Sequence, residues 1–288
     1  MPTYDVHQHL WPEQLIAELA RRRRPPRLRG STLELDRQGT SDVDLDAHRL
    51  ETRLRELDRD GIDVAVVSLQ PTLELEDLRP EESEPLLDAY HEGIVELAAA
   101  SGGRLRAFAA GRALDGFVGA SVAADALVDL AGAAALLDAL TRRRGVLFVH
   151  PSSCDLPPAM PGWWIPIVDY TAQMQAAYAA WIASGADRWP ELRVVFALLA
   201  GGAPFQLERL ASRGVDVRTV LRPTVFFETA SYGRRALELC LATFGVGQLV
   251  YGSDAPVIDP RPTLREIRGF GEAVADALCR DNPARLFG

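Results

Sequence analysis

The sequence predicts an α/β protein folded as a (β/α)8 barrel, and three observations lead to that prediction. Eight short apolar runs rich in β-branched residues recur along the 288 residues, and most of them lack strict alternation of apolar and polar side chains. Such runs are typical of parallel strands that are buried on both faces. Segments with helical periodicity lie between most of the runs, and the chain length is about that of one large barrel. We therefore expect a single domain over residues 1–288.

The spacing of the runs predicts a distorted barrel. The third and fourth strands are too close in sequence for a full helix between them, so we expect that helix to be missing or vestigial. A doubly wound open sheet is the alternative, but no Gly-x-Gly-x-x-Gly follows the first strand. The eight strands are expected at residues 3–6, 62–69, 105–109, 118–122, 146–149, 193–198, 224–228 and 249–251.

Apolar periodicity predicts the helices. Leu50, Leu54 and Leu57 line one face of a helix that ends at Gly61. The apolar positions between 86 and 98 line a second helix, with Pro85 placed at its start, where proline is favourable. Further helices are expected at residues 133–143, 165–184, 205–213, 234–244 and 263–280.

Residues 21–29 carry six arginines and two adjacent prolines, which predict a loop. We expect this loop to overhang the carboxyl ends of the strands, where Arg27 and Arg29 would contact an anionic substrate. The alternative is a solvated basic loop without a function.

Composition narrows the class of protein. Thirty-one Lys and Arg against forty Asp and Glu give a net charge of −9, which disfavours nucleic acid or an anionic membrane as partner. No apolar run approaches the ~18 residues of a membrane helix, and the first residues lack the pattern of a signal peptide. Three scattered cysteines do not suggest a disulfide framework. We expect a cytoplasmic protein that acts on a small molecule.

Three histidines and one aspartate are candidates for a metal site. His7 and His9 are two residues apart on the first strand, so they project from the same face and can share one ion. His150 and Asp254 end the fifth and eighth strands, and the carboxyl ends of barrel strands face a common centre. Each residue alone has a structural explanation, such as a turn cap for Asp254. His48 and His91 fall in amphipathic helices and are expected to be surface or packing residues.

The order of these motifs resembles the amidohydrolase superfamily. The chain has Asp-x-His-x-His from residue 5, His-Pro at 150, Gly-Ser-Asp-x-Pro from 252, and a closing Asn-Pro-Ala-Arg-Leu-Phe from 282. Within the superfamily it is similar to the amidohydrolase-related branch, which contains the aminocarboxymuconate-semialdehyde decarboxylase-like enzymes. The resemblance implies a distorted TIM barrel with one divalent ion, usually zinc, held by His7, His9, His150 and Asp254. It also implies that Asp254 takes part in proton transfer. The donor set itself suits Zn, Mn, Fe or Co.

One position departs from the pattern of that family. Leu198, six residues before Pro204, stands where the family has a histidine that contacts the metal-bound water or the substrate. Leucine can neither donate a hydrogen bond nor carry a proton. Either the reaction does without this group, or another residue replaces it, or catalysis has been lost.

Further residues are weaker candidates for the site. Glu228 ends the seventh strand, where an acid could face the substrate or pair with an arginine. Asp5 could orient an imidazole or make a structural hydrogen bond. Trp11, Trp163 and Trp164 follow the first and fifth strands and could wall a substrate pocket or simply pack. Cys154 could be a soft ligand, although a loop cysteine without a function is expected more often.

These observations favour a metal-dependent hydrolase that acts on a small ester, lactone or amide through a metal-activated water. The alternative, which the nearer branch implies, is nonoxidative decarboxylation of a small unsaturated or aromatic acid. A third hypothesis is a catalytically silent metal-binding barrel, motivated by Leu198. The resemblance also implies a homodimer.

Overall fold

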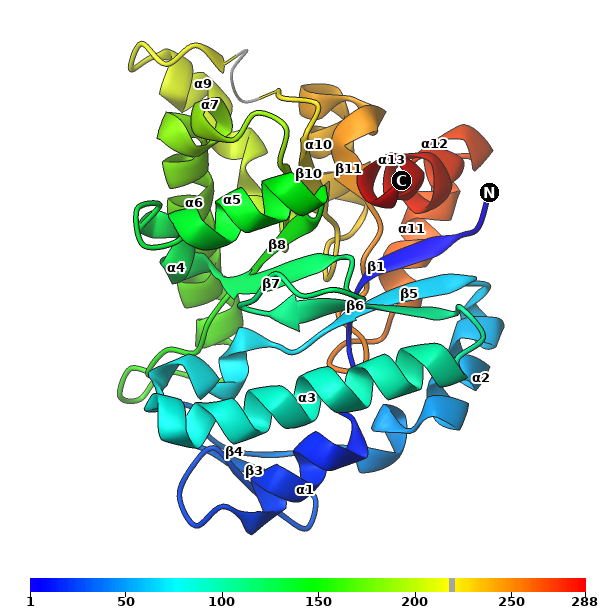
Figure 1. Ribbon diagram of the computed structural model, residues 1–288. Coiled ribbons are helices and arrows are strands. Elements are labelled where there is room, and N and C mark those ends of the chain that lie inside the picture. The colour runs from blue at the N-terminus through cyan, green and yellow to red at the C-terminus, as the bar shows by residue number, and fades with distance from the viewer. Residues whose placement is uncertain (218–220) are drawn as a thin grey trace.

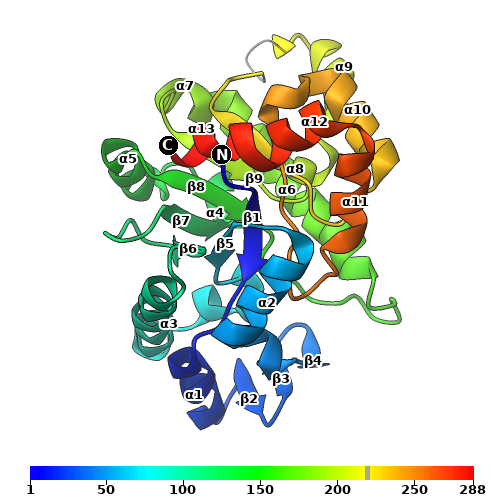
Figure 2. The ribbon, with the colours of Figure 1, turned by 90° about the vertical axis from the view of Figure 1, so that its right-hand side faces the viewer.

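Eight parallel strands form one sheet in the computed structural model, which describes residues 1–217 and 221–288 (Figures 1 and 2). Each strand pairs with the next one along the sheet, so every apolar run predicted as a strand is a strand. In sheet order the strands are β1 (Tyr4–His9), β5 (Val64–Ser68), β6 (Leu105–Ala110), β7 (Gly119–Ala123), β8 (Val146–His150), β9 (Arg193–Phe196), β10 (Val225–Glu228) and β11 (Leu249–Val250).

Backbone hydrogen bonds close the sheet into a barrel between β1 and the segment that follows β11. The N–H of Val6 donates to the carbonyl of Tyr251 at 2.9 Å, and the N–H of His9 donates to Ala255 at 2.7 Å. The N–H of Asp254 donates to the carbonyl of His7 at 2.8 Å. Because β11 itself has two residues, this closure depends on the irregular segment beyond it. The fold is therefore the predicted (β/α)8 barrel, distorted at its seam.

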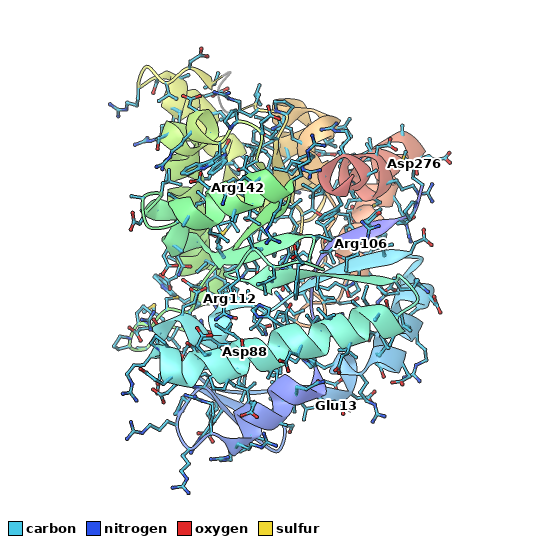
Figure 3. All side chains as sticks on the ribbon, viewed as in Figure 1. Glu13, Asp88, Arg106, Arg112, Arg142 and Asp276 are labelled. Carbon is cyan, nitrogen blue, oxygen red and sulfur yellow. The ribbon has the colours of Figure 1, made fainter. Side chains whose placement is uncertain are left out.

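Helices surround the strands, and one of the seven connections between consecutive barrel strands lacks a helix, as predicted. Residues 111–118 contain no helix, and Arg112 in that segment forms ion pairs with Glu84 and Asp88 of α3 (Figure 3). The helices are α1 (Glu13–Arg21), α2 (Leu50–Asp60), α3 (Pro80–Ala100), α4 (Ala124–Val128), α5 (Ala134–Arg143), α6 (Tyr170–Ala180), α7 (Ala186–Arg188), α8 (Leu199–Gly202), α9 (Pro204–Ala211), α10 (Arg234–Phe244), α11 (Arg261–Gly269), α12 (Glu272–Asp276) and α13 (Asn282–Phe287).

Two helix predictions need correction. The helix expected from Pro85 begins at Pro80, because another proline occupies the start and acidic residues that favour a helix N-terminus fill the first turn. The helix expected over residues 263–280 is interrupted at Gly271, whose φ of 102° ends α11 and lets the chain restart as α12.

A small antiparallel sheet lies between α1 and α2 and was not predicted. Its strands are β2 (Arg27–Arg29), β3 (Thr32–Leu35) and β4 (Gly39–Asp42), so the end of the expected arginine-rich loop is a strand. All four residues of β4 are exposed, which explains why apolar patterning gave no signal. The sheet lies beside α1 at one end of the molecule (Figures 1 and 2).

Across residues 1–217 and 221–288, none of the helices combines the length and the apolarity needed to cross a bilayer.

Candidate metal centre

Three histidines and one aspartate meet at the carboxyl ends of three strands. His7 and His9 lie on β1, His150 ends β8, and Asp254 belongs to the segment that closes the barrel. The Nε2 atoms of His7 and His9 are 3.2 Å apart, and they lie 3.4 Å and 2.9 Å from Oδ1 of Asp254. One ligand atom from each of the four residues lies within 4.8 Å of the others. The structure therefore brings together all four residues that the sequence singled out as ligands.

Oxygen acceptors fix the direction of all three imidazoles. The Nδ1 atoms are 3.0 Å from Oε2 of Glu228 for His7, 3.1 Å from the carbonyl of Ser68 for His9, and 2.8 Å from the carbonyl of Pro151 for His150. A carbonyl or carboxylate oxygen accepts, so each Nδ1 carries the proton and each Nε2 presents a lone pair to the cluster. Sequence reasoning missed Ser68 and Pro151 because their backbone carbonyls, rather than their side chains, make these contacts.

The protonation states of the cluster residues favour the binding of a cation. Burial lowers the pKa of His7 to about 4 and that of His150 well below its ordinary value, so both imidazoles are neutral near pH 7. Burial would raise the pKa of Asp254, but interactions with His7 and His9 outweigh it and lower the pKa to about 2. Neutral lone pairs and an ionised carboxylate that converge within 4.8 Å of one another form a favourable environment for a cation. Three imidazole nitrogens and one carboxylate oxygen fit a divalent metal ion.

Glu228 lies behind His7, on the side of the imidazole that faces away from the cluster. Its buried carboxylate accepts hydrogen bonds from His7 Nδ1 and from the backbone N–H groups of Leu198 and Ala230. Burial raises the pKa of Glu228, and the two backbone donors oppose that rise. Gly252 packs against the same pair: a Cβ there would lie 2.6 Å from Cβ of His7 and would also overlap Glu228. The glycine of Gly-Ser-Asp therefore leaves room for the carboxylate that orients His7.

A family model described as amidohydrolase matches residues 4–288, nearly the whole chain. The chain belongs to this family. The resemblance inferred from the histidine and aspartate motifs is thereby confirmed, and the matched range includes all four residues of the cluster.

Known proteins similar to this amidohydrolase include decarboxylases. Decarboxylase yanB from Aspergillus niger is 30% identical over 183 residues, which are 54% of this chain and 49% of that protein. The match thus spans about half the length of that curated relative.

Solved structures match nearly the whole chain. IDCase from Metarhizium anisopliae in its apo form matches with a TM-score of 0.81 and 20% identity, over 99% of this chain and 97% of that one. Dihydroxybenzoic acid decarboxylase from Polaromonas sp. JS666 matches with a TM-score of 0.73 and 16% identity, over 99% and 96% of the two chains. That structure contains manganese and the inhibitor 2-nitroresorcinol. At these identities the structural matches establish the barrel fold.

Leu198 begins a left-handed turn directly after β9. Leu198, Leu199 and Ala200 have φ values of 53°, 50° and 52°, a region that costs a non-glycine residue roughly 1–2 kcal/mol. The backbone N–H of Leu198 donates to Glu228 at 3.2 Å, which ties the turn to the support of His7. No other histidine of this amidohydrolase takes the place of the missing imidazole, because His48 and His91 accept backbone hydrogen bonds elsewhere.

The tryptophans expected near the site differ in exposure. Trp11 is buried, stacks on His48 with ring centroids 4.8 Å apart, and donates from Nε1 to Gln70. Trp163 is 60% exposed, and its ring lies 6.3 Å from that of Trp164. Trp11 therefore packs into the barrel wall, whereas Trp163 remains open to solvent.

Arg27 and Arg29 form all their hydrogen bonds within residues 20–34. Arg27 binds Glu34 and the carbonyl of Arg23, and Arg29 binds backbone carbonyls at 20, 22 and 28. Local oxygen atoms thus occupy these guanidinium groups, and among residues 1–217 and 221–288 no hydrogen bond joins either group to the metal cluster.

Asp5 and Cys154 do not orient or supply a ligand atom. Asp5 is buried and accepts hydrogen bonds from the backbone N–H groups of His7 and Ser253 and from the side chain of Gln8. Asp5 therefore makes structural hydrogen bonds within and beside β1. Burial raises the pKa of the Cys154 thiol to about 11, and the residue is not part of the cluster.

Sequence reasoning missed Arg53, which supports β1 from outside the barrel. Arg53 is 1% exposed and donates to the side chain of Gln8 and to the carbonyls of His9 and Ala47. A signal was present in the sequence. Arg53 lies three residues after Leu50 and four before Leu57, so an arginine occupies the apolar face of the predicted helix.

Proposed function

We propose that this amidohydrolase is a metal-dependent, nonoxidative decarboxylase of a small aromatic or unsaturated carboxylic acid. The observation that carries the proposal is the convergence of three Nε2 lone pairs and the Asp254 carboxylate at the carboxyl ends of the strands. The reaction class is supported by the relatives named as decarboxylases, one of which was determined with bound manganese. The substrate would be anionic, as expected from the sequence.

The chemistry divides between the ion and the chain. His7, His9, His150 and Asp254 would hold a divalent ion, which when bound would supply a Lewis acid that polarises oxygen atoms of the substrate. The bond between the carboxylate and its carbon breaks, CO2 leaves, and the electron pair that stays on carbon takes up one proton. Both short contacts of Asp254 use Oδ1, so its Oδ2 is available to pass that proton from solvent to the carbon.

Leu198 favours decarboxylation over the hydrolysis expected from the superfamily pattern. Hydrolysis needs two proton transfers, because a base must take a proton from the attacking water and an acid must give one to the leaving group. Decarboxylation delivers a single proton to carbon, and Asp254 suffices for that step. Leu198 is tied through its backbone N–H to Glu228, the acceptor of His7 Nδ1, so a hydrocarbon side chain stands in the turn where the family has an imidazole, and it cannot position an attacking water.

The donor set fits zinc, the ion expected from the sequence, and a dihydroxybenzoic acid decarboxylase of the same fold was determined with manganese. Elemental analysis of the purified protein distinguishes the two ions.

The test is a comparison of two substrate panels on protein reconstituted with zinc or manganese. Hydroxybenzoic acids are assayed for CO2 release, and lactones, esters and amides are assayed for hydrolysis. We expect CO2 release that falls at least about 10²-fold in Asp254→Asn, because general acid–base help contributes 10²–10⁴. Asp115→Asn, which alters a 95% exposed side chain in an ion pair with Arg143, is the matched control.

Leu198→His distinguishes the remaining outcomes. Hydrolysis without CO2 release in the parent would contradict the proposal in favour of a hydrolase. A parent that binds one ion but is inert toward both panels would instead indicate a silent barrel, particularly if Leu198→His gains turnover.

A further inference from the structure

The hairpin between β3 and β4 is fixed against two loops that follow barrel strands. Glu74, 3% exposed in the loop after β5, accepts hydrogen bonds from the backbone N–H groups of Asp36 and Arg37 at 2.7 Å and 3.1 Å. The hydroxyl of Ser153, in the loop after β8, donates to the same carboxylate at 2.7 Å. Because both loops begin at carboxyl ends of strands, the tip of the hairpin is anchored on the face of the barrel that carries the metal cluster.

From this anchored tip, Gln38 reaches the first residue of α6. The Nε2 of Gln38 donates to the hydroxyl of Tyr170 at 2.9 Å. One turn later on α6, Gln173 accepts a hydrogen bond from the backbone N–H of Ser152 at 2.8 Å. Tyr170 and Gln173 are three residues apart and share a helix face, so this face packs on the loop that starts at His150.

The hydroxyl of Tyr170 has a proton to give, and no acceptor for it lies among the described residues of the chain. Gln38 donates to the phenol oxygen, and no residue among 1–217 and 221–288 accepts a hydrogen bond from that hydroxyl. Burial raises the pKa of Tyr170 to about 12, and the charges of Cys154, Asp254 and Glu74 contribute to the rise. The phenol therefore stays protonated near pH 7.

We infer that Tyr170 is a specificity-determining residue, whose hydroxyl donates a hydrogen bond to an oxygen substituent on the ring of the substrate. Gln38 holds the phenol oxygen from one side, which directs the O–H toward the ligand. The inference rests on the proposed function for its substrate class. It adds that the acid carries an acceptor oxygen, such as a hydroxyl or a methoxy group, in addition to the oxygens held at the metal cluster.

Two variants separate this role from a merely structural one. Tyr170→Phe removes the hydroxyl and keeps the ring. Gln38→Glu replaces a donor by an acceptor, so the phenol proton turns toward the carboxylate and away from the ligand. The matched control is Tyr178→Phe, on the same helix. Its hydroxyl is buried without a partner, and its ring packs on Phe196 and Phe227.

The experiment measures binding of resorcinol and phenol, which differ by one hydroxyl and have no carboxylate to lose, to the metal-loaded protein by calorimetry. We expect the wild type and Tyr178→Phe to bind resorcinol about tenfold more tightly than phenol, the worth of one hydrogen bond. Tyr170→Phe and Gln38→Glu should lose that preference while phenol affinity changes less than about twofold. The inference is overturned if Tyr170→Phe prefers resorcinol over phenol as strongly as the wild type does, or if the wild type has no such preference.

Turnover provides the second readout and separates the two proposals. With 2,6-dihydroxybenzoate and 2-hydroxybenzoate as substrates, Tyr170→Phe should lower kcat/KM about tenfold for the first acid alone, mainly through KM. If no acid releases CO2 but the binding preference depends on Tyr170, the proposed reaction fails and the inference stands. If CO2 is released and both acids are affected equally by Tyr170→Phe, the inference fails and the reaction stands.

Discussion

The five histidines of this chain form two groups, and the difference lies in what their ring nitrogens face. His7, His9 and His150 direct Nδ1–H outward to oxygen acceptors and turn their Nε2 lone pairs toward one another. In His48 and His91, by contrast, one ring nitrogen uses its lone pair to accept a hydrogen bond from a backbone N–H. His48 accepts a hydrogen bond from the N–H of Trp11 at 3.0 Å, and His91 accepts one from Ala110 at 3.0 Å.

Burial does not distinguish the groups, and a lowered pKa occurs in both of them. All five side chains are at most 7% exposed, and burial lowers the pKa of His48 to about 3 and that of His91 to about 4, as it lowers the pKa of His7. A lone pair that already accepts an N–H bond has nothing to offer a metal ion, whereas three free lone pairs beside a carboxylate repel until a cation joins them. The direction of the lone pair therefore separates a ligand from a packing residue.

The largest expected effect comes from removing two ligands. His7→Ala with His9→Ala leaves His150 and Asp254, which are too few to hold a divalent ion tightly. Metal content, measured by elemental analysis, should fall from about one ion per chain to near zero, while the circular dichroism spectrum keeps its helical signal. His91→Gln is the matched control, since it alters a buried histidine outside the cluster. Metal stoichiometry that is unchanged in the double variant would remove the basis for the whole assignment.

A smaller effect is expected from the support of one ligand. Glu228→Gln replaces a carboxylate that accepts three N–H groups by an amide with a single acceptor oxygen. Either His7 or one of the two backbone N–H groups therefore loses its hydrogen-bond acceptor. Partners of this kind are worth 10–100-fold in metal affinity, and we expect a loss in that range by chelator competition. Glu238→Gln, which changes an exposed pair with Arg234, should leave the affinity unchanged. An unchanged affinity in Glu228→Gln would mean that the backbone alone orients His7.

The ligand group could be found from the sequence because its signal is local. His7 and His9 alternate on a strand, and His150 and Asp254 follow apolar runs, so strand periodicity and the rule for carboxyl ends place all four together. The eight strands were predictable for the same reason, since burial on both faces leaves a continuous apolar run.

The remaining features depend on contacts between distant parts of the chain. The bond between Gln38 and Tyr170 spans 132 residues, and the one between His7 and Glu228 spans 221. Polar side chains on exposed or irregular segments carry no periodicity, which is also why the strands at 27–42 escaped prediction. Leu198 could be identified as a departure, but its left-handed backbone could not, because a leucine gives no signal for positive φ.

The smallest expected effect concerns a packing histidine and the pH dependence of stability. The pKa of His91 is lowered by burial from 6.5 to about 4 in the folded chain, so between these values the unfolded chain binds more protons. Stability should therefore rise with pH from about 4 to 6.5 and be lost as the pH falls through that window.

His91→Gln keeps an acceptor for the N–H of Ala110 but cannot be protonated, so this part of the pH dependence should disappear. A shift of this size corresponds to at most about 3 kcal/mol, and we expect at least about 1 kcal/mol between pH 7.5 and 4.5. Urea unfolding of both proteins at pH 7.5 and 4.5 isolates the difference, since contributions from His7 and His150 are common to both. An equal loss of stability in the two proteins would show that His91 titrates normally, and its hydrogen bond to Ala110 would then not distinguish it from an exposed histidine.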